Sequence, residues 1–250
     1  MKKKTLTAVI LSAMVLTALS SCQAPAQSQV TETDASESSV TEVTTTTEES
    51  IATTAYTTTE STALEPAPGM DYYVFGHYEQ DGDEDNGPEP IEWVILTEED
   101  GRLFLTSRYI LDYQAYNIDY EDVTWETCSL REWLNNDFYN AAFDDEEKER
   151  VLTVINSNPD NNGYWATEGG NDTEDRVFLL SYDEAATYFA DDEARATGPC
   201  DWWWLRSPGR DPIHASIALF DGELMGPGHV VTFNYHDHGV RPAIWISVDP

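Results

Sequence analysis

The sequence predicts an α+β fold for residues 71–250, built on an antiparallel sheet with two to three short helices. Segments rich in β-branched and aromatic residues come first, helix start signals follow, and further strand-like segments end the chain. This order is typical of a sheet whose helices are segregated from its strands. With 180 residues and all 8 Trp of the chain, the region is long enough to bury a full core.

Three strands are expected in the first part of this region. The first is Tyr72–Tyr78, and the next two are Ile91–Thr97 and Arg102–Ser107, which are joined by a short polar turn ending at Gly101. Apolar runs on both sides of such a turn are typical of a β-hairpin.

Helix start signals follow the hairpin. Ser129 and Ser181 each precede a Glu by three residues, and these capping boxes predict helices over Leu130–Ala142 and from Ser181 to about Phe189. The capping pair of Asp144 and Glu147 starts one more helix.

That middle helix should carry Val151 and Ile155 on one face and end before the turn sequence of residues 158–163. The remaining segments of the domain read as strands separated by Gly, Pro or polar turns. They are Val177–Leu180, Trp202–Arg206, Ile213–Phe220, Val230–Phe233 and Val240–Ser247.

Several motifs resemble a family of uncharacterised bacterial domains that recurs in secreted and lipid-anchored proteins of gut Firmicutes. The resemblance rests on Pro90–Trp93, Thr124–Arg131, Trp133–Tyr139, Gly170–Ser181, Trp204–Pro208 and Gly239–Ala243. The Trp-rich strand and the final Gly-Val-Arg-Pro are also similar to the C-type-lectin-like fold of formylglycine-generating enzymes. That second resemblance implies a binding scaffold and not a reaction.

The N-terminus has the features of an export signal. Lys2, Lys3 and Lys4 precede an apolar stretch over Leu6–Leu19 that is short for a membrane span. The following Leu-Ser-Ser-Cys resembles the bacterial lipobox, which implies that Cys22 is acylated and that residues 1–22 comprise the signal peptide and the anchor. The expected location is the cell membrane, facing outside the cytoplasm.

Residues 23–70 form a predicted disordered linker. They include 13 Thr, 6 Ser and 8 acidic residues, with no Lys or Arg. Such a composition cannot bury enough apolar surface to offset the entropy of ordering the chain. A sugar-decorated stalk is the alternative.

The charge of the chain excludes an ordinary nucleic-acid binder. With 47 Asp+Glu against 13 Lys+Arg, the formal net charge is −34, which repels polyphosphates. It repels anionic lipid as well, so contact with the membrane is expected through the lipid anchor only.

Two cysteines lie in the predicted domain, Cys128 and Cys200. A disulfide between them would constrain the unfolded chain, and two buried free thiols are the alternative. Catalysis by Cys128 is a third interpretation, since a thiolate is favoured just before a helix, although no His or Lys adjoins it.

No resident metal or cofactor is expected. Asp81–Gly87 alternates carboxylates as a calcium loop does, with Glu92 following, but its Gly falls one place late. Asn171–Asp175 is a similar oxygen-rich loop, and His236 and His238 would share one strand face as some metal ligands do. Solvated loops are the ordinary interpretation, and calcium stays an alternative.

The predicted ligand-binding residues are Trp202, Trp204 and Arg206. Alternation along a strand directs these three side chains to one face and Trp203 to the other. Aromatic rings beside a guanidinium suit sugar rings, aromatic groups or carboxylates. The alternative is that Trp204 is packed and Arg206 pairs with an acid. Arg241 is expected to be structural.

These observations predict a non-catalytic binding module for a glycan, a peptide or a cell-wall component. An extracytoplasmic hydrolase or thiol-dependent oxidase is the second hypothesis, for which a pocket holding Cys128 or a carboxylate pair would speak. A wall-associated structural protein that binds divalent cations is the third.

Overall fold

The structure is a computed structural model that describes residues 70–161, 165–197, 201–232 and 238–248. The predicted signal segment with Cys22, and the predicted linker apart from Met70, lie outside these ranges. Within them, no helix has the length and apolarity needed to cross a bilayer.

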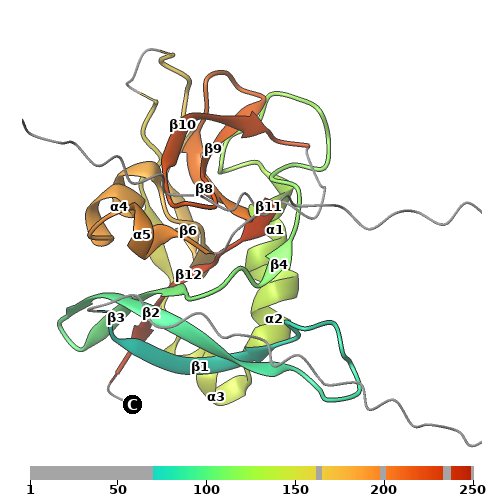
Figure 1. The fold of residues 1–250 in the computed structure, drawn as a ribbon, viewed down its shortest axis with the longest axis vertical. Coiled ribbons are helices and arrows are strands. Elements are labelled where there is room, and N and C mark those ends of the chain that lie inside the picture. The colour runs from blue at the N-terminus through green and yellow to red at the C-terminus, as the bar shows by residue number, and fades with distance from the viewer. Residues whose placement is uncertain (1–69, 162–164, 198–200, 233–237, 249–250) are drawn as a thin grey trace, which may run out of the picture. The chain divides into compact units, whose positions relative to one another are not determined.

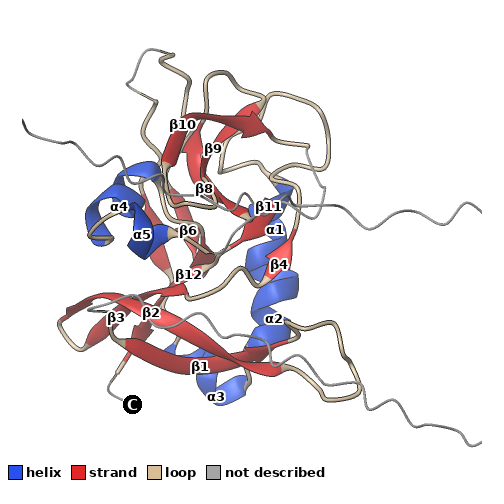
Figure 2. Cartoon of the chain, in the orientation of Figure 1, coloured by secondary structure: helices blue, strands red, loops and turns tan. Residues whose placement is uncertain are grey.

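The described part of the chain has an α+β fold with mostly antiparallel sheets (Figures 1 and 2), as predicted. Its strands are β1 (Tyr72–Tyr78), β2 (Glu89–Glu99), β3 (Arg102–Ser107), β4 (Asp112–Tyr113), β5 (Val154–Asn156), β6 (Thr173–Asp175), β7 (Val177–Phe178), β8 (Trp202–Pro208), β9 (His214–Ala218), β10 (Leu224–Val230), β11 (His238–Val240) and β12 (Ala243–Ser247). Its helical segments are α1 (Ser129–Trp133), the π-helical η1 (Leu134–Phe138), α2 (Tyr139–Ala142), α3 (Asp145–Arg150), α4 (Tyr182–Tyr188) and α5 (Asp192–Arg195).

The first sheet has the strand order β1-β2-β3-β12-β7, and every pairing in it is antiparallel. The predicted first strand and the predicted hairpin are confirmed as β1, β2 and β3. In the hairpin, Trp93 pairs with Ser107 and Glu99 with Arg102. These strands lie together in the lower part of Figure 1.

The second sheet has the order β10-β9-β8-β11-β4. In Figure 1, β8, β9 and β10 lie in the upper part of the view, and β11 and β4 lie near its middle. The chain passes from β11 in this sheet to β12 in the first sheet through Arg241 and Pro242. Arg241 is 2% exposed, and its Nε donates to Ser107 O at 2.7 Å. Its guanidinium contacts the rings of Phe189 and Trp203 at about 5 Å. This residue therefore joins the two sheets, in line with its expected structural role.

The helical segment that follows β4 runs without interruption over residues 129–142. Its N-cap differs from the prediction, because Cys128 accepts the hydrogen bond from Arg131 N through Sγ. The Ser129 hydroxyl instead accepts from Ile118 N at 3.0 Å. The capping boxes at Asp144 and Ser181 are confirmed.

Two element boundaries in the sequence prediction are wrong. The helix α3 ends at Arg150, and Ile155 lies in strand β5 instead of on a helix face, because β-branched residues there pair with β6. The strand expected at Val230–Phe233 is β10, which ends at Val230.

Glycine explains why the sequence predicts the strand β10 several residues too late in the chain. Gly228 in β10 has a φ of +66°, and a Cβ there would lie 1.8 Å from Ala215 O. Glycine has a low propensity for strands, so the sequence does not predict a strand at this position. The close approach of β9 nevertheless requires a glycine here.

Candidate functional site

The strand β8 does not present the open face predicted for Trp202, Trp204 and Arg206. Trp204 is 0% exposed, and its Nε1 donates to Gln114 O at 3.0 Å. Arg206 is 5% exposed and forms an ion pair with Glu184. The sequence prediction of an accessible face is therefore wrong, because β8 lies between β9 and β11 in the second sheet and residues 203–206, which alternate between its two faces, are all buried. Of the three residues, only Trp202 is half-buried.

An exposed tryptophan lies in a different part of the chain. Trp165 is 40% exposed and belongs to what we call the Trp165 loop, residues 158–161 and 165–171. At the base of this loop, Asn158 Nδ2 donates to Asn171 O at 2.8 Å, and Asn161 N donates to Thr167 O at 2.8 Å. These bonds hold the two arms of the loop against each other.

Two further contacts attach the Trp165 loop to the domain. Asn161 Nδ2 donates to Pro208 O and Gly209 O at 3.1 and 3.2 Å, at the C-terminal end of β8. Gly169 lies so close to the other arm that a Cβ there would be 2.2 Å from Asn158 O. The loop is thus fixed by backbone approach and hydrogen bonds, as binding loops on rigid scaffolds are.

Trp165 lines two clefts, one on each side of the loop. The first has a volume of about 380 Å³ and is lined by Pro159, Asp160, Asn161, Trp165, Tyr182, Asp183, Ser207, Pro208, Ser216 and Gly226. The second has a volume of about 510 Å³ and is lined by Asp122, Val123, Thr124, Thr127, Trp165, Ala166, Thr167, Glu168, Arg210, Asp211 and Pro212.

The residue after Trp165 has a strained backbone. Ala166 has a φ of +49°, a region that residues with a Cβ rarely adopt. Such strain costs of order 1–3 kcal/mol and persists where the surroundings enforce it, often at ligand-binding sites. Ala166 supports a functional interpretation of the loop.

The electrostatic character of both clefts is acidic. Asp160 and Asp183 are the charged residues lining the first, and Arg210 is the one cation lining either cleft within the described residues. Arg210 is held at the rim by His214, whose Nε2 lies 2.8 Å from Arg210 Nη2. The other ring nitrogen of His214 lies 2.5 Å from Asp211 Oδ1, so this His is committed to the turn.

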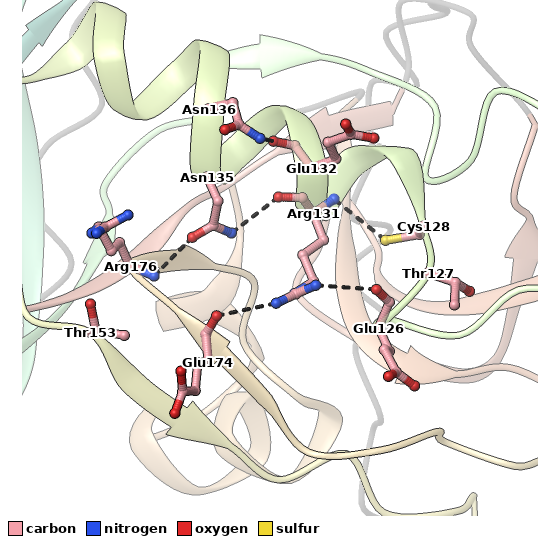
Figure 3. Close-up of a pocket in the computed structure, with 10 residues that line it drawn as sticks. All are labelled: Glu126, Thr127, Cys128, Arg131, Glu132, Asn135, Asn136, Thr153, Glu174 and Arg176. Carbon is pink, nitrogen blue, oxygen red and sulfur yellow. Dashed lines mark hydrogen bonds between the residues drawn. The ribbon is translucent and has the colours of Figure 1, made fainter.

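A third cleft, of about 540 Å³, holds Cys128 and carboxylates in its wall (Figure 3). Arg131 crosses it, with Nη1 donating to Glu126 O and Nη2 to Glu174 O, each at 3.1 Å. The Nε of Arg131 pairs with Asp175 Oδ1 at 2.5 Å. The guanidinium in this cleft is therefore occupied by the protein itself.

The thiol in this third cleft is poorly suited to nucleophilic attack. Cys128 is 2% exposed, and its Sγ lies 3.4 Å from Trp125 O, to which it donates. Burial raises the pKa of Cys128 to about 12, although the Arg131 amide and charge act in the opposite direction. A thiolate is therefore scarce at neutral pH. Cys128 is a free thiol in this structure, and Cys200 lies outside the described residues.

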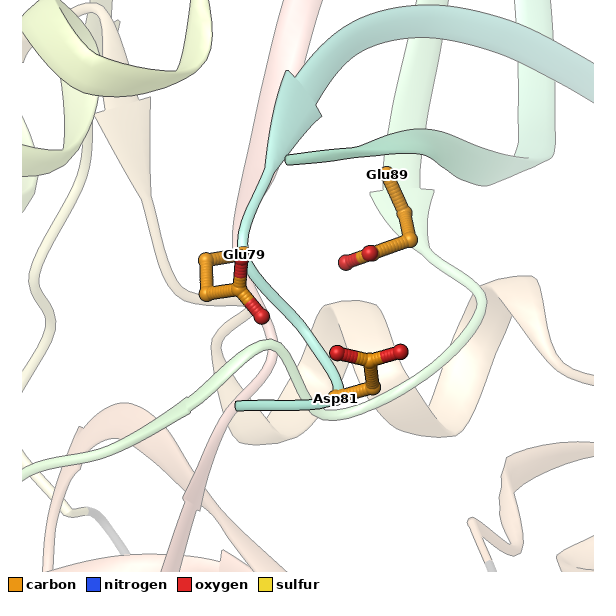
Figure 4. Close-up of side chains that lie close together, drawn as sticks. All are labelled: Glu79, Asp81 and Glu89. Carbon is orange, nitrogen blue, oxygen red and sulfur yellow. The ribbon is translucent and has the colours of Figure 1, made fainter. Parts of the chain in front are cut away.

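The acidic loop between β1 and β2 brings three carboxylates together (Figure 4). One oxygen of each of Glu79, Asp81 and Glu89 lies within 4.8 Å of the others. Each carboxylate accepts a bond from its own loop, for example from Gly82 N to Glu79 Oε1 at 2.8 Å. The amide of Asp83 lowers the pKa of Asp81, which keeps that carboxyl ionised. Glu92 is not in this group and instead pairs with Arg108.

Within the described residues, the second oxygen-rich loop contributes to no group of metal ligands. In the second oxygen-rich loop, Asp175 is fully buried and accepts bonds from Trp125, Asn156 and Thr173, so it is structural. His236 and the side chain of His238 lie outside the described residues.

Comparison with known proteins places the chain in one family. Residues 100–248 match the family described as Domain of unknown function (DUF6273). The chain belongs to this family. No curated protein and no solved structure matches this chain significantly. The family description carries no activity, and the C-type-lectin-like fold stays a prediction.

Sequence reasoning missed the Trp165 loop. The sequence predicts only a helix-ending turn at residues 158–163, and it predicts the ligand site in the aromatic strand at Trp202–Arg206. The signal that could have identified it is a tryptophan in a polar, Asn- and Gly-rich turn, where no core is available to bury it.

Proposed function

We propose that this chain is a non-catalytic binding module that holds a glycan at the Trp165 loop, outside the cytoplasm and anchored through Cys22. The observation that carries the proposal is Trp165, 40% exposed on a braced loop and lining two clefts. Buried tryptophans stabilise a fold, whereas an exposed one on a rigid loop offers a large apolar face at little entropic cost.

A glycan fits the surroundings of Trp165 better than the other predicted ligands. A sugar ring has an apolar face that stacks on an aromatic ring, and hydroxyls that exchange hydrogen bonds around its edge. The half-buried Ser207 and Asn161 line the first cleft with neutral polar groups, whereas Ser216 is 1% exposed and its hydroxyl donates to Pro208 O. A peptide would be recognised mainly through main-chain bonds along a strand edge. The edge strand β10 reaches the first cleft only through Gly226 among the described residues, so the preference for a glycan rests on the exposed ring of Trp165.

The location outside the cytoplasm rests on the sequence. The lipobox resemblance at Cys22, the Thr-rich linker and the net charge of −34 favour a domain held near the membrane by its lipid and kept off anionic lipid.

The glycan assay uses the full domain and insoluble polysaccharides. Binding is measured to chitin, cellulose, xylan, starch and purified peptidoglycan for the native protein, Trp165→Ala and Phe220→Ala. Phe220 is a matched control, since it is an exposed aromatic that lines none of the three clefts. We expect binding to at least one polysaccharide, with Trp165→Ala weakening it by about tenfold or more, and Phe220→Ala binding normally. Absence of binding to all five, or equal loss in both variants, would refute the proposal.

The anchor is tested separately in cells that make the full-length chain. Labelled palmitate should be incorporated into the native chain and not into Cys22→Ser, and the Ser variant should move to the soluble fraction. Equal labelling of both chains would show that Cys22 is not the acylated residue.

An enzyme is the second candidate, and the cleft with Cys128, Glu126, Glu132 and Glu174 is the observation that favours it. The raised pKa of Cys128 argues against thiol chemistry there. A hydrolase would release reducing sugar from the bound polysaccharide, with loss of that activity in Glu132→Gln. A structural protein that stores divalent cations is the third, and rests on the group of Glu79, Asp81 and Glu89.

A further inference from the structure

The two arms of the Trp165 loop line different clefts. Residues 159–161 line the cleft of about 380 Å³, and residues 166–168 line the cleft of about 510 Å³, while Trp165 lines both. Trp165 therefore borders both clefts, and a ligand that contacts it can extend into either one.

The first cleft offers one more aromatic ring and several neutral polar groups. Tyr182 lines it together with the Ser207 hydroxyl, which accepts from Tyr182 N at 2.9 Å. Gly226 of β10 leaves space there, because the nearest atom to an added Cβ would be Tyr182 Cε2 at 3.6 Å. A hydroxylated ring with one apolar face matches such a wall.

The second cleft is also lined by short hydroxyl side chains. Thr124, Thr127 and Thr167 contribute to it, and Arg210 adds a guanidinium at the rim. Asp122, Glu168 and Asp211 line the same cleft, so its charges sum to a negative value. With acids in both clefts, a polyanionic chain such as a polyuronate or a polyphosphate is disfavoured.

We propose that a neutral linear polysaccharide crosses Trp165, with sugar units in both clefts, so that the module binds within a chain and not at its end. This deepens the proposed function and rests on it. Two subsites joined through one ligand bind it more tightly than either alone, because the second contact forms without a new loss of translational freedom. Affinity should therefore rise with chain length until both clefts are filled.

The test measures the affinity of the intact domain for soluble oligomers of chitin, cellulose, xylan and starch, from disaccharide to hexasaccharide. For a series that binds, we expect the hexasaccharide to bind about tenfold or more tighter than the disaccharide. Reducing the terminal sugar to its alditol should leave the affinity of the hexasaccharide unchanged, since no chain end is recognised.

Two variants examine the clefts one at a time. Gly226→Leu places a side chain in the first cleft at a position whose φ is not positive, and Arg210→Ala removes a donor from the second. We expect both variants to weaken binding of the hexasaccharide. A disaccharide fills one cleft only, so at most one of the two variants should weaken its binding. Thermal melting of each variant, compared with the native domain, separates a lost subsite from a damaged fold.

The outcomes distinguish this inference from the proposed function. Binding that depends on Trp165 but is equal for disaccharide and hexasaccharide overturns the crossing chain and leaves glycan binding intact. Loss of binding on reduction of the chain end also overturns it. Failure of all four oligomer series to bind overturns the crossing chain, and it overturns the proposed function as well only if peptidoglycan also fails to bind. Tighter binding of polyuronates than of neutral chains contradicts the argument from charge.

Discussion

The strand β8 and the Trp165 loop both contain tryptophan, but the tryptophan side chains differ in how far they are buried. In β8, Trp203 and Trp204 are fully buried, and Trp204 contacts the rings of Tyr116 and Trp202 at 5.7 and 5.9 Å. In the loop, Trp165 remains 40% exposed. In this protein, the run of aromatic residues in the inner strand β8 belongs to the core, whereas the single tryptophan of the loop stays at the surface.

The two regions also differ in what fixes them. The strand is held by apolar burial and by the ion pair between Arg206 and Glu184. The loop is held by backbone contacts at its base, from Asn161 and Gly169. Side chains in the strand should therefore govern stability, and Trp165 should govern binding with little effect on stability.

Truncating the two tryptophans is the largest expected contrast. Trp204→Ala should lower the free energy of unfolding by about 3–5 kcal/mol through the cavity it leaves. Trp165→Ala should change it by about 0.5 kcal/mol or less. Urea unfolding followed by circular dichroism measures both. Comparable destabilisation by the two variants would remove the distinction between core strand and binding loop.

The ion pair beneath β8 should be visible in the pH dependence of stability. Burial by itself raises the pKa of Glu184, but the Arg206 guanidinium outweighs it, and the pKa is lowered from its usual 4.5. The stability from this pair is thus present above pH 4.5 and is lost as the pH falls through the lowered pKa.

Glu184→Gln removes the charge and keeps an acceptor for the capping box at Ser181. At neutral pH it should cost roughly 2–3 kcal/mol, because Arg206 stays buried without its anion. The gap to the native protein should narrow below pH 4.5. A gap that stays constant down to acid pH would show that the carboxylate charge is irrelevant.

Cys128 should react like a residue of the core. With a pKa raised to about 12 by burial, it should resist iodoacetamide in the native protein at pH 8 and react in guanidinium chloride. Mass spectrometry of the peptide containing Cys128 gives the extent of labelling. Fast labelling of the native protein would revive the thiol-enzyme hypothesis.

The smallest effect on stability is expected from calcium at the acidic loop, which belongs neither to β8 nor to the Trp165 loop. Since Glu79 and Asp81 bond to amides of their own loop, calcium or a chelator should shift the melting temperature by about 1 °C or less. A melting temperature that climbs with calcium concentration, and no longer does so in Asp81→Asn, would establish a metal site instead.

Much of the fold follows from local sequence signals. The hairpin of β2 and β3 and the capping boxes at Asp144 and Ser181 depend on residues close in sequence, and they were predicted. The end of α3 was not, because Val151 forms a bridge with Ile246, almost a hundred residues away. Long-range pairing of this kind overrides helical periodicity.

The candidate site was harder to predict for the same physical reason. Alternation along β8 correctly separates Trp203 from Trp204, but whether either face is open depends on what packs against the strand, and α4 reaches it through Glu184. The Trp165 loop has no periodicity, and its position depends on contacts with residues 208–209. Sequence pattern thus identified a tryptophan-rich protein and misplaced its exposed tryptophan.

The most direct measurement of the central claim is hydroxyl-radical footprinting of the domain, with and without the polysaccharide that binds it. The account predicts that oxidation of Trp165 falls sharply in the complex, while oxidation of Phe220 and of Trp204 does not change. Unchanged oxidation of Trp165 in a saturated complex, or protection confined to Trp202, would contradict it.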